Sequence, residues 1–92
     1  MTASRIDISL CPTDLECGDS GDIRDERRVI ESVIRFAAAR HPGALVTAQV
    51  GHRQGHAWAM VDGDREAGRD LMADYWEAHA DDASLYEIGG AA

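Results

Sequence analysis

The chain has no lysine and no asparagine, and its 92 residues include only two cysteines, two prolines and one phenylalanine. Two cysteines beside an ordinary apolar content do not make a disulfide scaffold. No apolar run approaches the roughly 18 residues that a membrane-spanning helix needs. The first residues, MTASRID, lack the charged and apolar regions of a secretory signal. We therefore expect a reduced, cytoplasmic protein with a single α+β domain over residues 1–92, frayed at 89–92.

Basic side chains are also scarce, because nine arginines face 17 carboxylates and leave a net charge of −8. This balance argues against direct binding of nucleic acid, whose phosphates are held by clustered cations. It suits a larger protein partner with a basic surface. The lack of lysine and asparagine also fits GC-rich coding or a halophilic host, in which case the charge serves only solvation.

Signals for catalysis are missing from the sequence. It contains no nucleophile elbow, no H-E-x-x-H pair and no glycine loop of the phosphate-binding kind. The stretch GHRQGH at residues 51–56 brings Gly, His and Arg together and could hold an anion, but a solvated hairpin tip uses the same residue types. We therefore expect a protein that is not an enzyme and that needs no cofactor.

The two cysteines stand at the ends of CPTDLEC, residues 11–17. Together with two histidines they could form a metal site, because thiolate and imidazole are common zinc ligands. Five residues separate the cysteines, whereas zinc motifs place about two to four between paired ligands. The spacing favours a simpler interpretation, in which Cys11 ends a strand and Cys17 lies on a loop. Our prediction is no metal site; the alternative hypothesis is a metal-binding or sensory module that uses Cys11, Cys17, His52 and His56.

Hydrophobic periodicity predicts the first two elements. Alternation of Ile6, Ile8 and Leu10 with polar residues predicts a strand that has one wet face. A helix should follow, with Asp22 as its N-cap and Pro42-Gly43 beyond its C-terminal end at Arg40 and His41. The apolar face of that helix would comprise Ile23, Ile30, Val33, Ile34 and Ala37, flanked by Val29 and Phe36.

Residues 44–50 and 56–62 predict two strands around the glycine-bracketed turn GHRQG. Two pairing registers are open, and they bury opposite faces of the second strand. We favour the register that buries Trp58 and Met60 on the same face as Val46, Ala48 and Val50. The other register would bury a different set and expose the tryptophan; that set is Ala57, Ala59 and Val61.

A second helix should begin at Gly63-Asp64, and a short strand at residues 84–88 should follow it. Gly68 costs about 1 kcal/mol of helix propensity, so we expect it to serve close approach of a neighbouring element. The remaining residues that we place on the inner face of this helix are Ala67, Leu71, Met72, Tyr75, Ala78 and His79.

The resulting order, β-α-β-β-α-β, predicts a ferredoxin-like sandwich. Its antiparallel sheet would carry both helices on one face, with strands one and three in the centre. The alternative is an α+β meander in which the last strand does not pair. Because both helices would lie on one face, apolar residues such as Leu45, Ala57 and Val61 would be exposed on the other face. This favours a homodimer or a partner that covers them.

The most specific feature is a row of carboxylates on the second helix. Glu66, Asp70, Asp74, Glu77 and Asp81 fall within about 80° of arc, opposite the apolar face. Like charges one turn apart destabilise an isolated helix by about 0.2–0.5 kcal/mol per pair, so stability alone would favour interleaved arginine. Trp76 borders the row and could act as an apolar anchor among the charges. A solvated surface without a partner is the simpler interpretation.

These features together predict a small acidic binding protein. We expect it to bind and block a basic, nucleic-acid-binding surface of a larger protein, through Trp76 and the five carboxylates. Phage-type inhibitors such as anti-CRISPR proteins, and immunity or antitoxin proteins, share this general profile of small size and negative charge. No residue-level match to any of those families supports the comparison.

Overall fold

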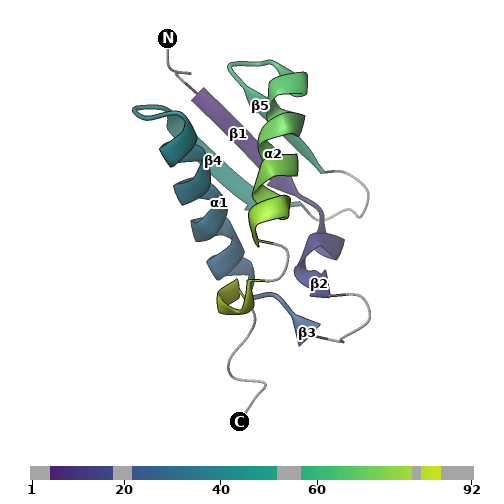
Figure 1. Cartoon of the computed structure of the whole chain (residues 1–92). Helices are drawn as coiled ribbons and strands as arrows, with labels where there is room; N and C mark the ends of the chain where they lie inside the picture. Colours follow the sequence, from purple (N-terminus) through teal and green to yellow (C-terminus); the bar gives the residue numbers. More distant parts are fainter. Residues whose placement is uncertain (1–4, 18–21, 52–56, 80–81, 86–92) are drawn as a thin grey trace.

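A computed structural model describes residues 5–17, 22–51, 57–79 and 82–85 of the chain. Two helices lie side by side over one face of a small sheet, so the fold is α+β with two layers (Figure 1). The elements follow in the order β1 (Arg5–Leu10), the 3₁₀ helix η1 (Pro12–Leu15), β2 (Glu16–Cys17), β3 (Asp22–Ile23), α1 (Glu26–Arg40), β4 (Leu45–Val50), β5 (Trp58–Val61), α2 (Arg65–His79) and the 3₁₀ helix η3 (Ala83–Leu85).

The sheet is mixed, and this corrects the antiparallel ferredoxin-like prediction. Its strand order is β4-β1-β5, with β4 parallel and β5 antiparallel to β1. The central place of the first strand is confirmed, but the third predicted strand, β5, lies at an edge of the described sheet and not in its centre. The hairpin is wrong, because β4 and β5 pair with opposite edges of β1 instead of with each other. Helix α1 returns the chain to the starting end of β1, which makes β4 parallel to it.

The expected fourth strand is not found among the described residues. Ala83–Leu85 form the 3₁₀ helix η3, and residues 86–88 lie outside the described part of the chain. A short ladder that the sequence did not predict pairs β2 with β3, beyond the end of β1 (Figure 1). The described residues therefore form an α+β fold with a β-α-β unit and one added antiparallel strand, which differs from the predicted ferredoxin-like sheet in strand count and order.

Residue pairing decides which side of the sheet is buried. Ile8 pairs with Ala48 and Ala59, and these three residues face the helices. Trp58 pairs with Ser9 on the opposite, open face and is 41% exposed, so the favoured register is wrong. Val61 is 8% exposed on the helix side, which corrects its expected exposure. Leu45 is exposed on the open face as predicted, whereas Ala57 is exposed but lies beside α2 instead of on the open face.

Helix α1 begins three residues later than predicted. Asp25 is its N-cap and accepts a hydrogen bond from the backbone N–H of Arg28, whereas Asp22 and Ile23 pair with β2. Ile23 is consequently exposed instead of belonging to the helix face. The C-terminal end is as predicted, with His41 as C-cap. The residues that α1 buries are Val29, Ser32, Val33 and Ala37, and Ile30 and Ile34 are only half-buried.

Helix α2 rests directly on the backbone of β5. Asp64 precedes it, and its carboxylate accepts hydrogen bonds from the backbone N–H groups of Glu66 and Ala67. A Cβ atom at Gly68 would collide with the carbonyl group of Ala59, which confirms the predicted close approach. Ala78, which we placed on the inner face, is exposed. Neither helix in the described ranges combines the length and apolar content that crossing a bilayer requires.

Candidate partner-binding site

The acidic row predicted from the sequence lies on the outer side of α2. Glu66, Asp70 and Glu77 are exposed, and Asp74 is partly buried. The opposite side of the same helix, which carries Gly68, Leu71 and Tyr75, packs on the sheet and α1. We call Glu66, Asp70, Asp74 and Glu77 the acidic stripe; Asp81, the fifth predicted member, lies outside the described residues.

One carboxylate of the stripe has a basic partner that sequence reasoning missed. Arg40, at the end of α1, donates from Nη1 to Asp74 Oδ2 over 2.5 Å. Both side chains are nearly half exposed, so the pair contributes at most about 1 kcal/mol. Within the described ranges, the carboxylates of Glu66, Asp70 and Glu77 form no ion pair. These three charges are therefore available to a cation from outside the chain.

Trp76 is half-buried beside the stripe instead of projecting from it. Its indole meets the Tyr75 ring edge-on, with 5.0 Å between ring centroids, and packs against the core. The Arg24 guanidinium lies over the indole, 5.0 Å from the ring centroid, and Arg24 also donates to the backbone carbonyl of Asp14. Trp76 is thus part of the molecule's own packing as well as a candidate contact residue.

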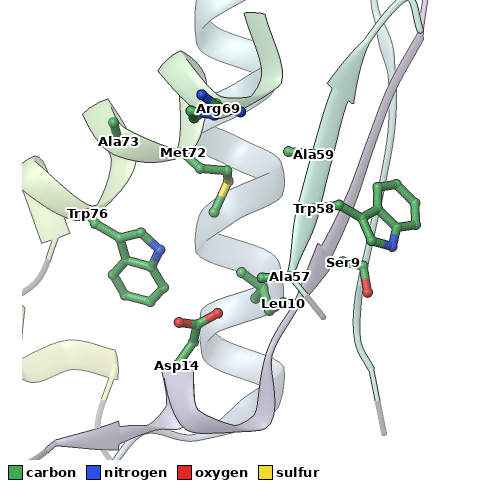
Figure 2. A pocket seen from close by; sticks show the side chains of 10 residues that line it. All are labelled: Ser9, Leu10, Asp14, Ala57, Trp58, Ala59, Arg69, Met72, Ala73 and Trp76. Carbon is green, nitrogen blue, oxygen red and sulfur yellow. The ribbon is translucent and has the colours of Figure 1, made fainter. Parts of the chain in front are cut away.

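A pocket of about 330 Å³ opens beside Trp76, between α2 and the strands β1 and β5 (Figure 2). Met72 and Trp76 extend into it from the helix, and the Asp14 carboxylate points into it from η1. Arg69 lies at the end of the pocket opposite Asp14. The residues that line it are Ser9, Leu10, Asp14, Ala57, Trp58, Ala59, Arg69, Met72, Ala73 and Trp76.

Sequence reasoning did not find this pocket, because its residues come from segments far apart in the chain. In CPTDLEC the two thiols are the obvious candidates for chemistry, but Asp14 is the residue that reaches the pocket. A local signal was present: Asp14 lies three residues after Cys11 and accepts a hydrogen bond from its backbone N–H at 2.9 Å. That bond fixes the carboxylate near the end of β1.

The residues of the alternative metal site are only partly described. Cys11 is 4% exposed and directly follows β1, so the strand ends at Leu10, one residue earlier than predicted; the Cys11 Sγ lies 3.0 Å from Thr13 Oγ1. Cys17 belongs to β2 instead of a loop. His52 and His56 fall outside the described residues. In the described ranges, no group of three or more His, Cys, Asp or Glu side chains could hold a metal ion.

A polar cluster lies at the C-terminal end of α2. The Asp82 carboxylate accepts hydrogen bonds from the hydroxyl and backbone N–H of Ser84 and lies 3.0 Å from His79 Nδ1. The Ser84 hydroxyl first, and His79 second, lower the pKa of Asp82 to about 2. The His79 ring stacks on Tyr75, whose own pKa is raised by burial. These contacts cap η3 and join it to α2, which is a structural role.

Comparisons with protein-family models, with curated proteins and with solved structures give no match for this chain. Function therefore has to be inferred from the chemistry of the acidic stripe and the pocket beside it.

Proposed function

We propose that this chain is a small non-enzymatic binding protein that uses α2 to occupy and block a basic surface of a larger protein. The surface would be one that otherwise binds nucleic acid, as expected for a phage-type inhibitor such as an anti-CRISPR protein, or for an immunity or antitoxin protein. The observation that carries the proposal is the row of Glu66, Asp70 and Glu77, which are exposed along one side of α2 and form no ion pair with any described residue.

Electrostatics supports this use of the stripe. Glu66 and Asp70 are one helical turn apart and repel each other by about 0.2–0.5 kcal/mol in an isolated helix. Arginine or lysine residues of a partner would remove that repulsion on binding. Clustered charge also accelerates encounter with an oppositely charged surface. A net charge of −8 adds a long-range attraction of the same sign.

The test compares two charge-neutralised variants of equal net charge. In the first, Asp70→Asn and Glu77→Gln remove two stripe charges; in the control, Glu26→Gln and Glu31→Gln remove two exposed charges of α1. Immobilised wild-type chain is used to capture a protein from the native host, and the captured protein is purified. We expect association with the stripe variant to be about tenfold slower and less dependent on salt, because such charges steer encounter.

The control variant should associate nearly as fast as the wild type. Adding the wild-type chain should also release nucleic acid from the captured protein, since both ligands would occupy the same basic surface. Equal association rates for the two variants would leave the stripe as a solvated surface and refute the proposal. Failure to displace nucleic acid would refute the blocking role.

A second copy of the chain is the other partner that the surface favours. Leu45 is 63% exposed and Trp58 is 41% exposed, and both lie on the sheet face opposite α1 and α2. Burial of apolar area is the usual driving force for association of such faces. We therefore propose that the open sheet face can form a homodimer, which leaves the acidic stripe on α2 free for the larger partner.

A further inference from the structure

We propose that the pocket beside α2 receives an arginine side chain from the basic partner. The guanidinium would lie against Asp14 and the Trp76 ring, and the methylene stem would pass along Met72. This inference rests on the proposed function, because it assigns the arginine to the same basic surface that faces the acidic stripe. It adds a defined anchor to what would otherwise be attraction between two charged surfaces.

The walls of the pocket match the two parts of an arginine side chain. Leu10, Ala57 and Met72 offer apolar contact for the stem, which arginine readily buries along apolar surface. Trp76 offers an aromatic ring for the planar guanidinium. The Arg24 guanidinium lies 5.0 Å from the centroid of that ring without lining the pocket, so the indole already has one contact of this kind within the chain.

The charges in the pocket give the ligand a direction. Asp14 Oδ2 accepts the backbone N–H of Cys11, and Oδ1 has no hydrogen bond among the described residues. A carboxylate held in this way can accept two parallel N–H bonds from a guanidinium. Arg69 at the opposite end would repel a cation, so the charged head should point to Asp14 (Figure 2).

Other occupants fit less well. An aliphatic side chain would displace water from Asp14 without replacing its hydrogen bonds, which is costly for a charged group. A lysine would supply a strongly hydrated point charge that cannot bond a carboxylate with two parallel donors. An acidic side chain would be repelled by Asp14. The combination of apolar walls, an aromatic ring and one carboxylate therefore favours arginine.

The pocket and the stripe form one continuous surface on α2. Ala73 lines the pocket and lies three residues after Asp70 and four before Glu77. Residues at these spacings are neighbours on a helix surface. A partner could therefore place one arginine in the pocket while its neighbouring cations contact Asp70 and Glu77. Asp14 adds a further carboxylate to this surface, inside the pocket.

The experiment measures binding of butylguanidinium, a side-chain mimic, to the ¹⁵N-labelled full chain by NMR titration. We expect saturable shifts of the Trp76 indole N–H and the Asp14 amide. Asp14→Asn keeps an oxygen acceptor for the Cys11 N–H but removes the charge, and should weaken binding about tenfold. Ala73→Leu should weaken it similarly by filling the pocket from the exposed side of α2, which gives a second test if Asp14→Asn unfolds the chain.

Two controls set the specificity. Butylammonium should bind several-fold more weakly than butylguanidinium, and the Glu26→Gln, Glu31→Gln variant of α1 should bind butylguanidinium within twofold of the wild type. Equal binding to Asp14→Asn, equal binding of butylammonium, or no saturable shift would each overturn the arginine site. If the acidic stripe does not bind the basic partner, the result is different: butylguanidinium still binds, but the captured partner associates equally with the stripe variant and its α1 control.

Discussion

The two faces of the sheet differ in how tightly they are packed and in how much apolar surface they expose. On the helix side, Ile6 and Ile8 are at most 2% exposed, and Gly68 brings the backbone of α2 onto that of β5. On the open side, Leu45 and Trp58 remain exposed around a polar centre. Asp7, at that centre, accepts hydrogen bonds from Arg5 and from the hydroxyl of Thr47.

The apolar side chains of the helix side are buried in the core, whereas those of the open side remain accessible to solvent or to a partner. At Gly68 the helix side leaves no room for even a methyl group, whereas the open side combines exposed apolar groups with hydrogen-bonded polar ones. Stability should therefore depend on the helix side, and association on the open side and on the outer surface of α2. Substitutions on each side can separate the two contributions.

The largest effect should come from Gly68→Ala. The added Cβ meets the backbone of Ala59, which cannot rotate away as a side chain could, so α2 must move off the sheet. The gain in helix propensity, about 1 kcal/mol, cannot offset this separation. We expect a loss of at least about 3 kcal/mol in the free energy of unfolding, measured by urea denaturation.

Gly51→Ala is the matched control for that substitution. Its Cβ would lie 3.4 Å from Ser9 Oγ and 3.6 Å from the Leu10 carbonyl oxygen, which is ordinary contact or close to it. We expect a change within about 0.5 kcal/mol. A Gly68→Ala variant as stable as the Gly51→Ala variant would show that α2 is not held against β5 as described.

The two tryptophans give the intermediate comparison. Trp76 packs against Tyr75 and Arg24, so Trp76→Ala should lower stability by about 2 kcal/mol as well as weakening partner binding. Trp58 lies on the open face, and Trp58→Ala should cost less than about 1 kcal/mol. Light scattering should show that Trp58→Ala shifts the chain toward monomer and that Trp76→Ala does not. Equal stability losses, or a wild type that is monomeric at high micromolar concentration, would contradict this division.

Local signals predicted much of this molecule, and long-range pairing accounts for what they missed. The start of α2, the place of Gly68 and the acidic stripe were predictable because capping, propensity and helical periodicity act over a few residues. The N-cap of α1 was not, since Asp22 and Asp25 are equally suitable and only the pairing of β3 with β2 decides between them. The apparent hairpin failed for the same reason.

The candidate site divides in the same way. Glu66, Asp70, Asp74 and Glu77 could be placed on one surface because all belong to one helix. The Arg40 partner of Asp74 could not, because it depends on how α1 and α2 lie side by side. The pocket joins residues of η1, β5 and α2, a combination that follows only from the strand order β4-β1-β5.

The smallest effect concerns the polar centre of the open face. The Thr47 hydroxyl, and then Arg5, lower the pKa of Asp7 below its usual 3.8. Because the folded pKa lies below the unfolded one, Asp7 stabilises the fold above the unfolded value, and this contribution is lost as pH falls through the folded pKa. Thr47→Val removes the main donor, so the pKa should rise toward 3.8, whereas Thr47→Ser should leave it low. A ¹³C titration of the Asp7 carboxyl measures the pKa in both variants.

The free energy of unfolding should show the same dependence on pH. The part of the difference between wild type and Thr47→Val that depends on the charge of Asp7 should vanish at a pH low enough to protonate Asp7 in both proteins. An unchanged Asp7 pKa in Thr47→Val would assign the shift to Arg5 instead.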